Sequence, residues 1–112
     1  MITNKFTNIR VDGMACAVSV KWVSVESLKD GSNDEMLNRF IKNTSVTGHY
    51  ECGPRQTAAD LACVAARRIL DAQVIDRNEV GIVVYATQYP DYKSPSTACV
   101  LQDRLGLSQD CM

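Results

Sequence analysis

The stretch Gly81–Leu107, GIVVYATQYPDYKSPSTACVLQDRLGL, decides the fold because a strand pattern, a loop pattern and a helix pattern follow one another in it. Residues 82–86 form an unbroken run of β-branched, aromatic and small apolar residues, which is typical of a strand covered on both faces. Residues 87–93 carry two tyrosines, a proline and an aspartate, and this composition predicts a loop at the carboxyl end of the strand. Buried strands of this kind belong to layered α/β proteins, so the stretch predicts an α/β fold.

A helix is expected directly after this loop. Ser94 supplies an N-cap oxygen and Pro95 a preset first-turn φ angle. Gly106 is expected to end the helix, with Leu107 folding back as the apolar contact of the cap. The apolar residues along one side of this helix are Ala98, Leu101 and Leu105.

Two more helices are predicted earlier in the chain, each from a capping box. Ser32 with Glu35 predicts a helix over residues 33–43, and Thr57 with Asp60 predicts a helix over residues 57–72. Two arginines of the second helix, Arg67 and Arg68, are expected to point away from its apolar face. That apolar face is expected to consist of Leu61, Ala62, Val64, Ala65 and Ile69.

The other segments are more extended in character. Residues 6–18 read as two short strand pieces around a turn at Asp12-Gly13, and together they form the expected first strand. Ser24 can start a short helix that ends before Gly31. Residues 44–54 carry no helical period and are expected to cross the surface as an extended arm. The alternation of strands and helices again favours α/β, and a parallel arrangement would place another strand after the last helix.

Length and charge limit the function. The 112 residues make one domain at most, and a formal charge of -1 with intermingled signs leaves no basic stripe for a phosphate backbone. We therefore expect no nucleic-acid partner. No window has the length and apolarity of a membrane span and the amino terminus has no signal-peptide pattern, so we expect no membrane partner and a cytoplasmic location.

The five cysteines form no metal-binding pattern. Their number is odd, none forms a C-x-x-C pair, and His49 is the single histidine available to help them, so no metal site is predicted. The composition favours small buried thiols in a reducing compartment. His49 itself has no neighbouring acid or nucleophile in the sequence and is expected at the surface.

Three segments together carry a resemblance to a known family. TAADLACVAARRIL at residues 57–70, VGIVVYAT at residues 80–87 and PSTACVLQDRLGL at residues 95–107 resemble the amino-terminal part of a β-ketoacyl-acyl-carrier-protein synthase III, within the thiolase-like superfamily. The similarity runs from about Asn8 to Met112. It rests on the order and spacing of several segments, of which PSTACVLQDRLG is the sharpest.

The resemblance implies that residues 1–112 are the amino-terminal portion of a thiolase-like αβαβα layered domain whose remainder is absent. In the family the next segment is a strand that leads to a nucleophilic cysteine, so that nucleophile is expected just after Met112. Cys111 precedes that strand and is not the nucleophile. The assisting histidine and asparagine belong to the second half of such enzymes, so the resemblance assigns no catalytic residue to this chain.

The chemistry that the resemblance implies is a decarboxylative Claisen condensation of an acyl primer with malonyl carrier protein, in fatty-acid or related polyketide biosynthesis. The substrate would be a coenzyme A thioester, with no permanently bound cofactor. The implied partners are acyl-CoA or an acyl-carrier protein, malonyl-acyl-carrier protein, and a second subunit in a homodimer. The chain alone would contribute scaffold, some coenzyme A contact and a subunit interface.

Site residues follow from the resemblance at two places. Family members hold the adenine of coenzyme A between a tryptophan and an arginine, which correspond here to Phe40 and to Asn43 or Thr44. Phe40 can stack on the adenine or serve as an apolar core residue of its helix. The loop from Thr87 to Ser94 corresponds to the family's acyl-pocket and dimer loop, where the small Ser94 leaves room for a longer or branched primer. Ser94 can serve that role, the N-cap role, or both.

A second hypothesis remains beside the enzymatic one. A free-standing chain of this length without a nucleophile and base would be a non-catalytic oligomerisation or interaction module. The reading frame beyond Met112 separates the two hypotheses.

Overall fold

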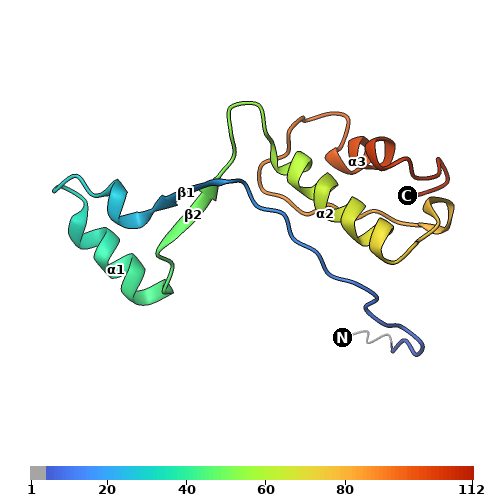
Figure 1. Cartoon of the computed structure of the whole chain (residues 1–112), viewed down its shortest axis with the longest axis horizontal. Coiled ribbons are helices and arrows are strands. Elements are labelled where there is room, and N and C mark those ends of the chain that lie inside the picture. The colour runs from blue at the N-terminus through green and yellow to red at the C-terminus, as the bar shows by residue number, and fades with distance from the viewer. Residues whose placement is uncertain (1–4) are drawn as a thin grey trace.

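The computed structural model describes residues 5–112 and has an elongated, open shape (Figure 1). Its extents are 54 × 40 × 30 Å and its radius of gyration is 18.7 Å. A compact domain of this length has a radius of gyration of about 13 Å. The elements form two groups, a strand pair with a helix in the first half of the chain and a helix pair in the second half.

The first group is built on a short antiparallel pair. Strand β1 (Lys21–Ser24) pairs with β2 (Gly48–Glu51), and Trp22 lies directly opposite Tyr50. The two aromatic rings meet edge to face at 5.0 Å, an arrangement that aromatic quadrupoles favour. The arm expected over residues 44–54 is extended and largely exposed as predicted from residue 45 onward, and its residues 48–51 pair with β1 as strand β2.

A 3-10 turn and a helix connect the two strands. The turn η1 (Val25–Leu28) is capped by Ser24, as predicted. Helix α1 (Asp34–Thr44) begins after Asn33, whose side chain makes no cap bond, so the predicted capping box of Ser32 and Glu35 is wrong. The Ser32 hydroxyl donates to Asp30 at 2.7 Å instead, because the carboxylate of Asp30 lies within the same tight turn.

The second group packs α2 (Ala58–Ala72) against α3 (Thr97–Leu105). The predicted capping box of Thr57 and Asp60 is confirmed at the start of α2. The predicted face of α2 is partly wrong, because Val64 is 57% exposed and Arg67 donates to the Arg104 carbonyl of α3 at 2.8 Å. The core cluster that joins these helices consists of Cys63, Leu70, Leu101, Leu105, Leu107 and Cys111.

The ends of α3 test the predicted caps. Ser96 is the N-cap and accepts a hydrogen bond from the Cys99 amide, so the N-cap role predicted for Ser94 is wrong. The helix begins two residues later than expected, at Thr97, with Pro95 outside it. At the other end Gly106 has the expected left-handed φ of 66°, which favours glycine, and Leu107 is buried as predicted.

Residues 80–86 cross between the two helices as an extended segment. Val80, Val83 and Tyr85 pack against the core cluster, while Ile82 is 60% and Val84 85% exposed. The backbone of Met112 donates to the Gly81 carbonyl and accepts from the Val83 amide, which is one rung of a parallel ladder. The predicted strand covered on both faces is therefore covered on one face only, because the helix pair packs against one side and Ile82 and Val84 lie exposed on the other. The flanking strands that a sheet would supply at its edges are also missing within residues 5–112, apart from the rung at Met112.

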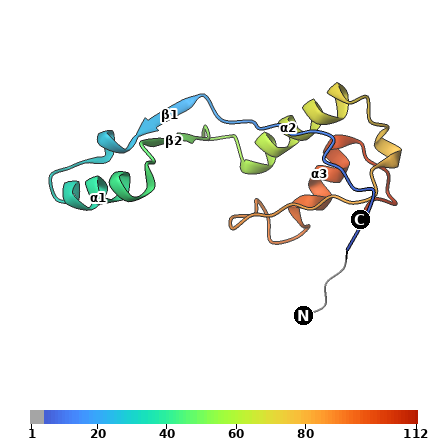
Figure 2. The same ribbon diagram turned by 90° about the horizontal axis from the view of Figure 1, so that it is seen from below.

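The first strand expected over residues 6–18 is not formed, since residues 5–20 are irregular up to the start of β1. Figure 2 shows this segment running from β1 past α2 toward the amino terminus. Gly13 lies against α2, where a Cβ added to it would be 3.4 Å from the Ile69 side chain. The apolar residues of this segment that stay exposed, because no other element of residues 5–112 packs over their side chains, are Phe6, Ile9, Val11, Met14, Val18 and Val20. Within the described residues no helix has the length and apolarity to cross a membrane.

Candidate functional site

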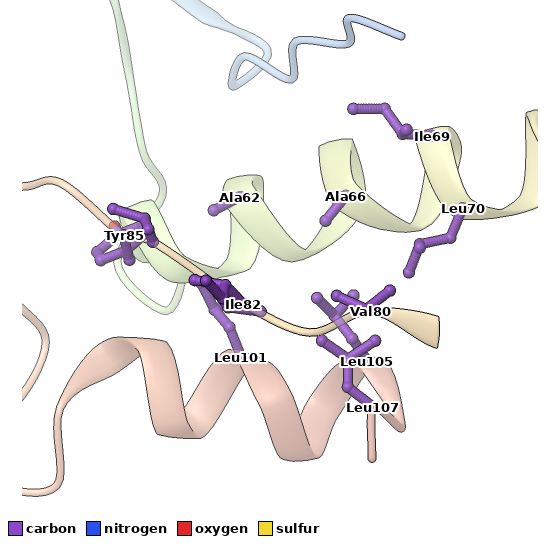
Figure 3. Close-up of a pocket in the computed structure, with 12 residues that line it drawn as sticks. Ala62, Ala66, Ile69, Leu70, Val80, Ile82, Tyr85, Leu101, Leu105 and Leu107 are labelled. Carbon is purple, nitrogen blue, oxygen red and sulfur yellow. The ribbon is translucent and has the colours of Figure 1, made fainter. Parts of the chain in front are cut away.

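An apolar groove opens between α2, α3 and residues 80–86, with a volume of about 330 Å³ (Figure 3). Figure 3 shows the extended segment passing between the two helices, with side chains of α2 on one side and of α3 on the other. No charged side chain lines the groove. Its lining consists of Ala62, Ala66, Ile69, Leu70, Val80, Ile82, Val83, Val84, Tyr85, Leu101, Leu105 and Leu107.

The chemistry of this groove is binding and not catalysis. Its walls are aliphatic apart from one tyrosine, so they provide neither a nucleophile nor an acid-base pair. Burying apolar groups against such a surface stabilises the bound state by roughly 25 cal/mol for each Å² of apolar surface removed from water. The groove is suited to an apolar strand or side chains.

A polar network at the start of α2 holds the loop over residues 87–96. The Thr57 hydroxyl donates to the Asp91 carboxylate at 2.7 Å, although the two residues are 34 positions apart. The Thr57 amide donates to Asp60 at 2.8 Å, and Arg104 of α3 pairs with the other oxygen of Asp60 at 2.8 Å. The amino end of α2, the middle of the loop and the last turn of α3 are thereby tied together.

This network shifts the pKa values of two of its side chains, Asp60 and Arg104. Hydrogen bonds from the Thr57 backbone, and then from Arg104, lower the pKa of Asp60 below its ordinary value of 3.8. The hydrogen bond to Asp60 in turn raises the pKa of Arg104. Both charges are therefore favoured in the folded state.

Asp60→Asn should make the stability of the fold less sensitive to acid, because the variant lacks the carboxylate whose contribution the wild type loses at low pH. A lowered folded-state pKa means that the carboxylate stabilises the fold above pH 3.8 and that this contribution is lost as the pH falls through the folded-state pKa. The variant should therefore melt at a lower temperature than the wild type at neutral pH, with the difference narrowing below pH 3.8. Circular dichroism melts across this range test it, with Asp110→Asn as an exposed control; an Asp60→Asn difference that is constant with pH would contradict it.

The coenzyme A residues implied by the resemblance lie at the end of α1. Phe40 is 43% exposed, so within residues 5–112 its ring is not a core residue and is accessible. The Thr44 hydroxyl donates to the Phe40 carbonyl at 2.8 Å, while the Asn43 side chain is exposed. The structure places these three residues on one turn of helix, and their role stays a prediction.

The residues of the predicted acyl-pocket loop lie elsewhere. Thr87 accepts a hydrogen bond from the Tyr89 amide at 3.1 Å, and Ser94 is exposed. Figure 1 shows this loop beside α3 and far from α1, so the structure does not bring the two predicted sites together. The residues that tie the loop down, Asp91 and Arg104, gave no signal in the sequence because their partners are distant along the chain.

The remaining candidate residues divide between surface and core. His49 is at the surface as predicted, but the expectation that it has no acidic neighbour is wrong, because its Nε2 lies 3.4 Å from an oxygen of Glu51, two positions along the strand. The prediction of buried thiols holds for Cys63 and Cys111 and is wrong for the other three, which lie on irregular or exposed segments: Cys16, Cys52 and Cys99. Within the part of the chain that the structure describes, no three His, Cys, Asp or Glu side chains are grouped to hold a metal ion.

The arrangement is a mixed α/β segment that matches the amino-terminal part of the thiolase-like fold. The structure of OleA E117Q from Xanthomonas campestris matches this chain over its whole length, with a TM-score of 0.82 and 20% identity. The match covers 35% of the OleA chain. At that identity the likeness establishes the fold alone.

Two solved structures are more similar in sequence. A 3-oxoacyl-(acyl-carrier-protein) synthase III is 30% identical, with a TM-score of 0.72, over 88% of this chain and 29% of that one. The tetronic acid condensing enzyme AbyA1 is 31% identical, with a TM-score of 0.66, over 84% of this chain and 30% of that one. The chain is thus related to the amino-terminal region of synthase III-like condensing enzymes and spans about a third of their length. No protein-family profile matches it.

Proposed function

We propose that this chain serves as the amino-terminal portion of a 3-oxoacyl-acyl-carrier-protein synthase III-like acyltransferase. The complete enzyme would take an acyl group from a coenzyme A thioester onto a cysteine and condense it with malonyl carrier protein, with loss of carbon dioxide. In this proposal residues 1–112 supply scaffold and binding surface, and the nucleophile lies beyond them.

The observation that carries the proposal is the match of 88% of the chain to the first part of a synthase III at 30% identity. The uncharged groove supports it, because an apolar surface of this kind suits the interior of a larger layered protein. The rung between Met112 and residues 81–83 supports it as well, since a parallel strand beside the segment is what a β-α-β unit around α3 requires.

The exposed ring of Phe40 and the loop over residues 87–94 would serve the substrate in this enzyme. Phe40 stands half-exposed on α1 and would stack on the adenine of coenzyme A. The loop, anchored through Asp91, would border the acyl pocket with the small Ser94 at the position that limits primer size. Both roles are part of the proposal.

The 112-residue chain by itself should give no 3-oxoacyl product from acyl-CoA and malonyl carrier protein, because within residues 5–112 no nucleophile is paired with a base. Product detection by mass spectrometry tests this, with an intact synthase III as the positive control. Alkylation should also find no cysteine that reacts unusually fast. Saturable turnover by the isolated chain would contradict the assignment of catalysis to residues beyond Met112.

The reading frame beyond the Met112 codon tests the rest of the proposal. We expect it to continue into a strand and a cysteine in a short Cys-Ser-Gly or Cys-Ala-Gly context, and the protein that it encodes should lose condensing activity when that cysteine is alkylated. A stop codon at this point would instead favour the non-catalytic oligomerisation or interaction module.

A further inference from the structure

The segment over residues 84–95 is held to the rest of the molecule by one hydrogen bond. It begins after Val83, whose amide is bonded, and ends before Ser96, which caps α3. In the part of the chain that the structure describes, the single hydrogen bond or ion pair that leaves this segment joins the Asp91 carboxylate to the Thr57 hydroxyl. The position of the segment on α2 therefore depends on one pair of side chains.

Burial identifies the same anchor. From residue 86 to residue 96, Asp91 is the single residue that is not exposed. Tyr89 and Tyr92 lie close to it in the sequence and are 84% and 58% exposed, so their rings do not pack the segment against the core. The bond to Thr57, and not apolar packing, thus places the middle of the segment.

The Thr57 hydroxyl serves α2 and the segment at once. A hydroxyl has one proton to donate and lone pairs that accept. Its oxygen accepts from the Asp60 amide as the N-cap of α2. Its proton goes to Asp91 at 2.7 Å, because the other acceptor within reach, an Asp60 oxygen, is 3.3 Å away. A hydroxyl that donates to a carboxylate at so short a distance makes one of the stronger side-chain hydrogen bonds.

Arg104 offsets the charge that this bond brings to α2. The carboxylates of Asp60 and Asp91 both bond to Thr57, so two negative charges lie near one another. Arg104 pairs with Asp60 at 2.8 Å, and its pKa is raised chiefly by that hydrogen bond, with a further contribution from the charge of Asp91. One guanidinium group thus balances both carboxylates, which favours the docked position of the segment.

We infer that Thr57 and Asp91 are positioning residues for the substrate, because the bond between them fixes the loop over residues 87–94 and with it the width of the acyl pocket. A segment anchored in its middle has fewer accessible conformations than one held at its ends alone. The consequence for the acyl pocket rests on the proposed function of this loop. The anchoring itself is a property of the 112-residue chain.

Limited digestion of the 112-residue chain by trypsin tests the anchoring. Trypsin cuts after Lys93, at a rate that follows the population in which the segment has left α2. Asp91→Ala removes the bond and keeps the cap of α2, so it should speed this cut about tenfold or more without changing the circular dichroism spectrum. Gln88→Ala is the matched control, because Gln88 is exposed in the same segment, and it should be cut like the wild type.

Variants of Thr57 separate this bond from a general loss of structure. Thr57→Ser keeps a hydroxyl and should be cut as slowly as the wild type, whereas Thr57→Val should be cut faster. When Asp91 is already alanine, Thr57→Val should add little to the rate, because the two residues act through one bond. Effects of the two substitutions that simply multiply would overturn the inference, as would an Asp91→Ala chain that is cut no faster than the wild type.

Primer selectivity tests the consequence for the substrate in the protein that continues beyond Met112. Values of kcat/KM are compared for acetyl-CoA and decanoyl-CoA with malonyl carrier protein. Asp91→Ala should reduce the preference between these primers about tenfold, because a released loop no longer fixes the pocket. An unchanged preference would overturn the inference. A wild type that forms no 3-oxoacyl product would overturn the proposed function instead, while digestion of the 112-residue chain still decides the anchoring.

Discussion

Leu101→Ala should lower the free energy of unfolding by about 2–3 kcal/mol. Leu101 is 4% exposed and lies on the face of α3 that meets α2. Truncating it removes apolar atoms from the core cluster and widens the groove beside it. The expected cost lies in the lower part of the range for leucine truncation, because water entering the open groove fills part of the space.

Urea unfolding followed by circular dichroism measures this effect as a lower midpoint with an unchanged slope. Val64→Ala is the matched control on the facing helix. Val64 is 57% exposed, so its truncation should change the stability by no more than about 0.5 kcal/mol. Equal losses for the two variants would mean that α2 and α3 do not form the core described above.

Gly48→Ala should destabilise the β1–β2 pair by about 1–3 kcal/mol. A Cβ at this position would overlap the Trp22 ring and come within 2.5 Å of the Val23 carbonyl oxygen. The half-exposed tryptophan ring can swing outward, but the carbonyl belongs to the paired strand and cannot move without breaking the register of Ser24 with Gly48. The strands must therefore separate locally.

Trp22 reports this change directly, because it is the single tryptophan and its ring meets Tyr50 edge to face. We expect a red-shifted emission and a loss of near-ultraviolet circular dichroism in the variant. Gly53→Ala is the control, since a Cβ there has no atom within 4 Å and should leave both signals unchanged. Retention of the native emission in Gly48→Ala would show that the strand pair accommodates the methyl group.

Features that depend on neighbouring residues could be predicted from the sequence. The capping box of Thr57 and Asp60 and the left-handed Gly106 involve groups within a few positions, and both are present. The start of α3 shows the limit of such patterns, because Ser94 and Ser96 both offer a hydroxyl and only the backbone path decides which one caps the helix.

Features that depend on distant partners could not be predicted in this way. The apolar run over residues 82–86 indicated a strand, but a strand also needs neighbours, and within residues 5–112 only Met112 pairs with it. The anchor of Thr57 on Asp91 and the pair of Asp60 with Arg104 likewise join segments far apart in the sequence. The candidate substrate residues came from the family resemblance, while the groove became visible only in the packed structure.

The division of the elements into two groups also bears on how the chain acquires its structure. Every element of the strand-pair group lies within residues 21–51, and the helix pair with its extended segment follows from residue 58 onward. Each group therefore closes its contacts within one continuous stretch of chain, which keeps the loops to be closed short. During synthesis the ribosome would release the complete β1–α1–β2 group before α2 has emerged, so the first half could fold while the second is still being made.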